Sequence, residues 1–302
     1  MKIEFKQFVK AENKSFTSLQ CIILVKDFFN FDSNVFQLFQ LIIVNLLFVS
    51  VLKTVKFPAM KENKYDNPAF FDQYEKMLRS QIGLEGAGEW HTLKHMLPDF
   101  QGKNILDLGC GFGWHCRYAI ENGAQSVIGV DLSERMLSKA KEINNLEGIH
   151  YERKALEDLD YPAEKFDVIL SSLTLHYVKS FDTLVRNIYQ WLIPGGSFIF
   201  SVEHPVFTAE GGQDWIYDKS GEKISWPVDR YFVEGKRNTT FLGENVIKYH
   251  RTLTSYLNTL LKQSFIIKEV IEPEPSQEML KEIPEMKEEL RRPMMLLISV
   301  EK

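Results

Sequence analysis

A glycine-rich turn between two short apolar segments constrains the fold of this chain more than any other feature. Asn104–Gly109 (NILDLG) has the length and composition of a buried strand, and Trp114–Asn122 can form the helix that leaves the turn. Gln125–Asp131 (QSVIGVD) is a second such strand, and it ends in an acid. Alternating short strands and helices predict βαβ units, and therefore an α/β fold that is doubly wound around a mostly parallel sheet.

The turn itself predicts a ligand. Gly109, Gly111 and Gly113 occupy alternate positions, with Cys110 between the first two. Glycines allow backbone conformations closed to other residues, and they let a ligand approach the main chain. Asp131 is placed to bind the vicinal hydroxyls of a ribose, as in other nucleoside-binding doubly wound folds. We therefore expect a nucleoside across the carboxyl ends of the first two strands; the alternative is a glycine-rich turn without a ligand.

The spacing of the glycines excludes two common nucleotide motifs. A dinucleotide fingerprint requires G-x-G-x-x-G. Trp114 or Cys116 stands where the third glycine belongs, depending on which glycine is counted first. A phosphate-binding P-loop would require Gly-Lys-Ser/Thr, and these residues are absent from the turn.

Four segments, taken in order, resemble one known family. Asp107–Gly113 (DLGCGFG) resembles motif I of class I S-adenosylmethionine-dependent methyltransferases, and Asp131 matches their second-strand acid. Phe166–Ser172 (FDVILSS) looks like their fourth strand, and Leu192–Gly196 (LIPGG) looks like their turn into strand five. The resemblance extends from about Tyr65 to the C-terminus, and it is strongest to the small-molecule, type 11-like branch.

The resemblance implies a seven-stranded, mostly parallel sheet with strand order 3-2-1-4-5-7-6 and an antiparallel strand seven. Ser264–Ile271 and Pro293–Glu301 suit strands six and seven. The expected domain organisation is an N-terminal extension (residues 1–59) and a methyltransferase domain (60–302) divided into lid helices (60–100), cofactor-binding core (101–204), substrate-cap insertion (205–250), and final helix with strands six and seven (251–302).

The same resemblance assigns residues to the cofactor, S-adenosylmethionine. Asp107 and the carbonyl of Gly109 would hold the methionyl ammonium, while Gly111 and Gly113 let the cofactor lie on the loop. Tyr65 would fold over the cofactor, unless it is a core tyrosine. The remaining assigned residues are Cys110 in the loop, Asp131 at the ribose, Leu132, Met136, Leu156 and Glu157 around the adenine, and Ser171 at the methionyl end. Glu157 could instead belong to an exposed acidic turn.

Methyl transfer is an in-line displacement, so much of the catalysis is positioning, and a base is needed only for a protonated nucleophile. His204, at the end of strand five, is the first candidate base, because the ordinary histidine pKa suits proton transfer near neutrality. Glu203 and His176 are the other candidates, and His204 could also be structural. Side chains alternate along a strand, so only one of Glu203 and His204 should face the substrate.

Aromatic residues are frequent in the insertion 205–250, where they either cover the substrate or form a small satellite core. Arg251 could pair with an acidic group of the substrate. The expected substrate contacts are Tyr177, Trp226, His250 and Arg251. We expect no metal site, because His91 and His95 share a helical face without a third ligand.

Composition separates the first 59 residues from the rest. They contain no Gly, Trp, Tyr, His or Arg, and their 7 Lys and 4 acidic residues give a net charge of +3. The remaining 29 basic and 37 acidic residues give −8, which argues against nucleic acid as a partner. Residues 33–52 carry no charge and could associate with a membrane, although their Gln and Asn residues oppose a span. The extension is therefore either dispensable or an anchor.

The three cysteines form neither a zinc-ligand pattern nor an even set, which favours a reduced, cytoplasmic location. We expect an S-adenosylmethionine-dependent methyltransferase that acts on a small molecule. Two other functions fit the same motifs. One is a nucleoside-cofactor oxidoreductase, and the other is a binding module that keeps the cofactor without turnover.

Overall fold

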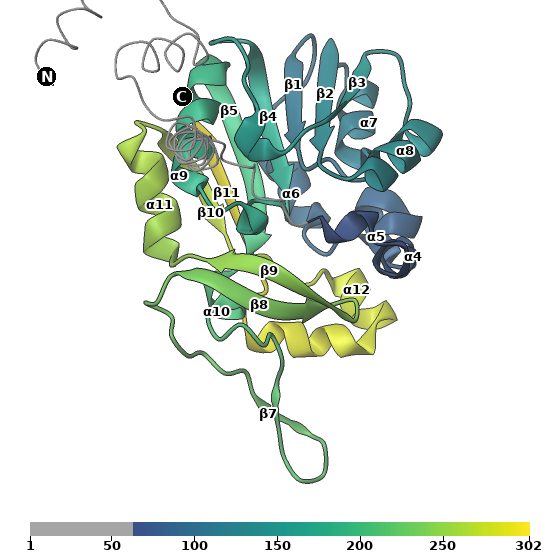
Figure 1. Ribbon diagram of the computed structural model, residues 1–302, viewed down its shortest axis with the longest axis vertical. Helices are drawn as coiled ribbons and strands as arrows, with labels where there is room; N and C mark the ends of the chain where they lie inside the picture. Colours follow the sequence, from purple (N-terminus) through teal and green to yellow (C-terminus); the bar gives the residue numbers. More distant parts are fainter. Residues whose placement is uncertain (1–62) are drawn as a thin grey trace, which may run out of the picture. The chain divides into compact units, whose positions relative to one another are not determined.

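The computed structural model describes residues 63–302, which lie in the second of two compact units, Glu62–Lys302. Figure 1 shows a twisted sheet with helices on both sides. The strand order is β10-β11-β5-β4-β1-β2-β3, and only β11 runs antiparallel to its neighbours. The predicted fold and strand order are therefore confirmed. The seven strands are β1 (Asn104–Leu108), β2 (Ser126–Asp131), β3 (Ile149–Arg153), β4 (Phe166–Ser172), β5 (Leu192–Glu203), β10 (Ile266–Ile271) and β11 (Met295–Glu301).

Alternation along the strands gives the sheet two apolar faces. In β1, Leu106 and Leu108 pack in a cluster with side chains of α9 and α11, whereas Ile105 packs with α6, α7 and α8. Asp107 comes two residues after Ile105 in the strand, so its side chain lies on the same face of the sheet, where α7 packs. The helices are α4 (Pro68–Glu75), α5 (Leu78–Gln81), α6 (Trp90–Met96), α7 (Trp114–Glu121), α8 (Glu134–Ile143), α9 (Phe181–Trp191), α10 (Pro205–Thr208), α11 (Leu253–Lys262) and α12 (Gln277–Glu282).

Short 3-10 turns connect several elements and place side chains at the carboxyl edge of the sheet. They are η1 (Lys64–Asp66), η2 (Gly83–Gly86), η3 (Leu156–Asp158), η4 (Leu175–Tyr177) and η5 (Pro284–Arg291). Three of them, η1, η3 and η4, contain residues that the sequence assigned to the cofactor or the substrate.

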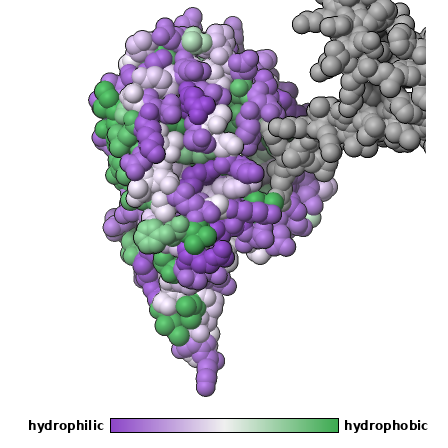
Figure 2. All heavy atoms as spheres, turned by 60° about the vertical axis from the view of Figure 1, so that its left-hand side comes forward, coloured by the Kyte–Doolittle hydropathy of each residue, from purple (hydrophilic) through white to green (hydrophobic). Residues whose placement is uncertain are grey.

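The insertion between β5 and α11 folds into two hairpins. Their strands are β6 (Ile216–Tyr217) with β7 (Lys223–Ser225), and β8 (Gly235–Phe241) with β9 (Glu244–His250). Figure 1 shows the β7 hairpin projecting away from the sheet. Ile216 and Ile224 on it are half exposed, and apolar side chains are visible along this arm in Figure 2.

Residues 1–59, with the apolar segment 33–52, lie outside the described part of the chain. Within residues 63–302, no helix is both long and apolar enough to cross a bilayer. The same residues contain no group of three His, Cys, Asp or Glu side chains that could hold a metal ion.

Candidate functional site

The loop after β1 is held in a left-handed conformation by its glycines. Gly109, Gly111 and Gly113 have φ of 76°, 54° and 76°, a region that side chains disfavour. The amides of Gly109 and Cys110 both donate to the Val130 carbonyl, which fixes the loop against the end of β2. Backbone geometry is therefore by itself a sufficient reason for glycine at these three positions.

The three glycines differ in what surrounds them. A Cβ on Gly109 would lie 2.2 Å from Thr174 Oγ1, and one on Gly113 would lie 2.2 Å from the Tyr151 hydroxyl. A Cβ on Gly111 would meet no atom closer than 4.0 Å. The outer glycines are thus packed against protein, while the middle one faces open space where a ligand can contact the main chain.

Asp131 ends β2 beside this open position. Its Oδ2 accepts a hydrogen bond from the Gly111 amide (3.0 Å), and its Oδ1 accepts one from the Ser133 amide (2.9 Å). Burial raises the pKa of Asp131 against the opposing effect of these amides. A carboxylate has about four acceptor positions, so these amides leave room for hydroxyl donors.

Asp107 lies below the loop and is 1% exposed. Its Oδ2 accepts a hydrogen bond from the Cys116 thiol (3.3 Å). Burial raises the pKa of Asp107 to about 7, and the thiol only partly offsets this shift. A cation brought next to this carboxyl would favour its ionised form.

Three tyrosines gather over the loop. The ring centroid of Tyr65 lies 5.4 Å from that of Tyr74 and 6.3 Å from that of Tyr177, both edge to face. The Tyr65 hydroxyl is 3.3 Å from the Tyr177 hydroxyl, and the Tyr74 hydroxyl is the atom nearest to the open side of Gly111. Burial raises the pKa of all three phenols, so they are neutral near pH 7.

A largely buried ion pair, Arg79 with Glu89, lies at the end of β4. Arg79 donates to Glu89 Oε1 (3.1 Å) and to Ser172 Oγ (3.3 Å), and Ser172 Oγ donates to the same carboxylate oxygen (2.8 Å). Among the described residues, Glu89 Oε2 has no hydrogen-bond partner, and neither does the indole N–H of Trp114 at the start of α7.

These two buried groups have opposite hydrogen-bonding character, because Glu89 can accept and Trp114 can donate. Buried polar atoms without partners are uncommon and call for an explanation. The methionyl end of the expected cofactor carries an ammonium and a carboxylate, so it could satisfy one group of each kind. The residues present therefore fit this cofactor.

A second polar cluster lies at the end of β5. Glu203 forms an ion pair with the buried Lys248 of β9 and accepts a hydrogen bond from Gln213 Nε2 (2.7 Å). Burial would raise the pKa of Glu203, but His176, Lys248 and these hydrogen bonds hold it below its ordinary value. The Lys248 Nζ lies 6.0 Å from the ring centroid of Tyr177, so the cluster adjoins the tyrosines.

His176 belongs to this cluster and His204 does not. His176 Nδ1 accepts from the Glu203 amide (3.3 Å), and burial lowers the pKa of His176 to about 4. His204 Nδ1 accepts from the Val206 amide (3.0 Å) and so caps α10. Its Nε2 lies 2.7 Å from Glu272 Oε1, although outside hydrogen-bonding geometry. Both nitrogens of His204 therefore face protein groups away from the tyrosines.

Three of the four predicted substrate contacts, His250, Arg251 and Trp226, instead bond to or pack against other protein groups. His250 is fully buried between Thr208 Oγ1 and the Tyr231 carbonyl, each 2.8 Å away. Arg251 donates to the carbonyls of Val178 and Lys179, at the start of α9.

Trp226 stacks on Phe207 at 4.9 Å, with the Arg292 guanidinium 4.1 Å from its ring centroid. This packing forms a satellite core. Of the four predicted substrate contacts, Tyr177 is the one that adjoins both Tyr65 and the Glu203–Lys248 ion pair.

The remaining cofactor candidates surround the loop. Ser171 is buried and donates to the Leu108 carbonyl (2.9 Å), which ties β4 to the end of β1. Met136 and Leu156 are buried, Glu157 is exposed on η3, and Leu132 uses its carbonyl to accept from Arg153 Nε (3.3 Å).

Sequence reasoning did not single out Arg79, Glu89, Tyr74 or Lys248. Arg79, Tyr74 and Glu89 belong to the segment before β1, where no glycine motif or strand end marks a position. Lys248 is one residue of an alternating strand, and only its burial (2%) distinguishes it from its surface neighbours.

Comparisons with known proteins agree with this geometry. A family model described as a methyltransferase domain matches residues 106–200. A proposed S-adenosylmethionine-dependent methyltransferase from Listeria monocytogenes has a crystal structure with 60% sequence identity and a TM-score of 0.70, covering 73% of this chain and 99% of its own. An S-adenosylmethionine-dependent methyltransferase from Mesorhizobium loti has 47% identity and a TM-score of 0.68, covering 73% of this chain and 100% of its own.

An uncharacterized protein of Haemophilus influenzae is 35% identical over 253 residues, which are 80% of this chain and 98% of that protein. High identity over almost the full length of these relatives, together with the seven-stranded sheet, shows the family. The chain therefore belongs to the class I S-adenosylmethionine-dependent methyltransferases of the type 11 branch, and S-adenosylmethionine is its cofactor.

Proposed function

We propose that this methyltransferase acts on a small molecule that binds between the three tyrosines and the end of β5. The observation that carries this proposal is the contact between the two groups, since Tyr177 adjoins both Tyr65 and the Glu203–Lys248 pair. S-adenosylmethionine supplies a methyl group on a sulfonium, and the protein's contribution is to orient the reacting groups.

On the cofactor side, we assign Asp131 to the ribose hydroxyls and Asp107 with Glu89 to the methionyl ammonium. Arg79 and the Trp114 indole would bind the methionyl carboxylate. These assignments rest on the raised pKa of Asp131 and Asp107 and on the two unpartnered buried atoms. Each carboxyl lies where a cation or a hydroxyl pair would offset its desolvation.

On the acceptor side, Glu203 replaces His204 as the residue that faces the substrate. Glu203 is ionised near neutrality because its pKa is lowered, and Lys248 and Gln213 occupy both of its oxygens. His176 accepts through Nδ1, so its neutral ring carries the proton on Nε2 and can only donate there. Neither group is a strong free base.

This arrangement supports an acceptor whose nucleophile reacts without a dedicated base, such as a neutral amine or a stable anion. The test is incubation with S-adenosylmethionine carrying a labelled methyl group and matched panels of amines, phenols and aliphatic alcohols. We expect labelled products from the amine or phenol panels. Products from aliphatic alcohols alone would contradict the proposal, because such hydroxyls need a base.

Substitutions at the end of β5 then identify the acceptor-facing residue. Glu203→Gln should lower turnover at saturating cofactor, whereas His204→Gln should preserve it within about twofold in the folded protein, since His204 caps α10. The reverse result would return the role to His204. A cytoplasmic location is the compartment that we propose, supported by the two buried free cysteines, Cys110 and Cys116.

A further inference from the structure

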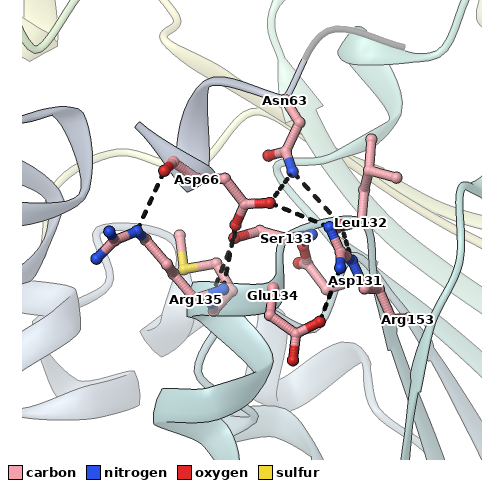
Figure 3. Close-up of polar contacts among 9 residues, drawn as sticks. Asn63, Asp66, Asp131, Leu132, Ser133, Glu134, Arg135 and Arg153 are labelled. Atoms are coloured by element: carbon pink, nitrogen blue, oxygen red, sulfur yellow. Dashed lines mark hydrogen bonds and ion pairs between the residues drawn. The ribbon is translucent and has the colours of Figure 1, made fainter. Parts of the chain in front are cut away.

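The partly buried turn η1 is bonded to the start of α8 and the end of β3, mainly through the carboxylate of Asp66 (Figure 3). Its Oδ1 accepts from Ser133 Oγ (2.6 Å) and from the Arg135 amide (3.1 Å). Its Oδ2 accepts from Asn63 Nδ2 (2.6 Å) and lies 3.4 Å from an Arg153 guanidinium nitrogen. Asp66 thus joins η1 to the start of α8 and to the end of β3.

Ser133 connects this carboxylate to the ribose-binding acid. The Ser133 amide donates to Asp131 Oδ1 (2.9 Å), while its hydroxyl donates to Asp66 and accepts from the Met136 amide (3.1 Å). Ser133 is 1% exposed, so water cannot easily replace these partners. Displacing Asp66 would free the Ser133 hydroxyl and loosen the residue that orients Asp131.

Asp66 is also the sequence neighbour of Tyr65, one of the three tyrosines of the site. The two residues are adjacent in a turn of three residues, and Tyr65 bonds Tyr177 across the loop. Asp66 itself is 28% exposed and its partner Arg153 is 53% exposed, so the attachment lies at the surface where it can break and re-form. Segment 63–75, which comprises η1 and α4, is referred to below as the lid segment.

We propose that Asp66 is a positioning residue for the cofactor, which holds the lid segment closed and orients Asp131 through Ser133. This inference rests on the proposed role of Asp131 at the ribose. The opposing view is that Asp66 only stabilises the first turn of α8, as acids at helix starts commonly do. A stabilising role would lower the melting temperature without a specific effect on the cofactor.

The experiment measures binding of S-adenosylhomocysteine to full-length variants by calorimetry and stopped-flow kinetics. Asp66→Ala should weaken binding by about tenfold or more, mainly through faster dissociation, because charge-assisted hydrogen bonds are lost. Asp66→Asn should weaken it less, since its amide oxygen still accepts from Ser133 and Arg135. The matched control is Asp160→Ala, which removes an exposed acid outside the lid segment and should change nothing.

A double-mutant cycle with Asp131→Ala tests the route through Ser133. Coupled residues are non-additive, so Asp66→Ala should cost less affinity in the Asp131→Ala background than in the wild type. Additive losses would overturn this route. Equal affinities of Asp66→Ala and Asp160→Ala, whatever their melting temperatures, would overturn the whole inference.

Two safeguards keep these outcomes interpretable. If Asp66→Ala does not fold, Asp66→Asn and Ser133→Ala take its place, and unchanged dissociation rates in both would overturn the inference. Normal binding by Asp131→Ala would overturn the ribose assignment in the proposed function. If only the inference about Asp66 is wrong, Asp66→Ala binds normally while Asp131→Ala still binds weakly, so the two outcomes can be told apart.

Discussion

The two halves of the proposed site, assigned above to the cofactor and to the acceptor, are built in different ways. The cofactor half comprises the loop 109–113 with Asp107 and Asp131, and it uses backbone conformation and residues close in the sequence. The acceptor half comprises Glu203, His176, Gln213 and Lys248, and its central ion pair joins residues 45 positions apart. Backbone requirements leave a glycine signature in the sequence, whereas a long-range side-chain pair leaves none.

The halves also differ in their charge. Burial raises the pKa of Asp107 and Asp131, and neither acid forms an ion pair with another residue of the described part of the chain. In the acceptor half, Lys248 neutralises Glu203, whose pKa is lowered. A cationic cofactor therefore suits the first half, and the second half provides a nearly neutral surface for the acceptor.

The largest expected effect comes from breaking the acceptor half. Lys248→Met leaves Glu203 buried without its cation and should cost about 3–5 kcal/mol of unfolding free energy. Denaturant unfolding measures this loss. Adding Glu203→Met should recover much of it, because the unpaired charge is then removed. A loss below about 1 kcal/mol in Lys248→Met alone would show that the Glu203–Lys248 pair is exposed to solvent and not buried.

Asp131→Ala is the corresponding test of the cofactor half. Loss of two charge-assisted hydrogen bonds should weaken binding of S-adenosylmethionine and S-adenosylhomocysteine by about 2–4 kcal/mol. The unfolding free energy without ligand should not fall in parallel, because burial disfavours the charged Asp131. Asp160→Ala, at an exposed acid, is the control. Tight binding of NADH in place of these ligands would contradict the assignment.

Two glycines with the same φ separate backbone strain from packing. Gly113 and Gly195 both have φ of 76°, but only at Gly113 would a Cβ overlap a neighbour, the Tyr151 hydroxyl. Alanine at Gly195 should cost about 1–2 kcal/mol from its left-handed conformation. Alanine at Gly113 should cost about 1–3 kcal/mol more and also weaken cofactor binding. Equal losses of unfolding free energy in the two variants would mean that the loop around Gly113 shifts readily to accommodate the added Cβ.

The smallest expected effect on cofactor binding is a pH dependence from Asp107, whose protonation also affects stability. Its pKa is about 7 in the folded protein and 3.8 ordinarily, so the folded state holds the proton more tightly than the unfolded state. The resulting stabilisation is complete below pH 3.8 and is lost as the pH rises to 7.

Cofactor binding should show the opposite trend, because the methionyl ammonium favours the ionised carboxyl. Affinity should rise about tenfold between pH 6 and pH 8, with release of a proton. Calorimetry in buffers of different ionisation enthalpy measures both quantities. Asp107→Asn should bind with little pH dependence, and a wild-type affinity that is flat over this range would contradict the assignment.

The sequence predicted the elements in which local rules decide the structure. The predicted strands Asn104–Gly109 and Gln125–Asp131 contain β1 and β2, and the predicted helix Trp114–Asn122 contains α7. Alternation along β5 separated Glu203 from His204, but it could not say which faced the substrate. Our proposal of Glu203 rests on its ion pair with Lys248, whose position is set by the pairing of β8 with β9.

Asp66 and Glu89 were missed for the same reason. Their partners, Ser133 and Ser172, lie 67 and 83 residues further along the chain, and no motif connects them. Hydrogen bonds over such separations depend on how the lid segment and α6 pack on the sheet. Periodicity, glycine spacing and capping patterns describe only neighbours in the sequence.

The position of β11 has a consequence for synthesis on the ribosome. This strand pairs with both β5 and β10, although it follows them in the chain. Until Met295–Glu301 has been translated, the edge of β5 has no partner, and the apolar residues Phe198, Phe200 and Val202 lie near that edge. Unpaired edges of this kind promote aggregation. A nascent chain halted before residue 295 should therefore depend on chaperones until translation resumes.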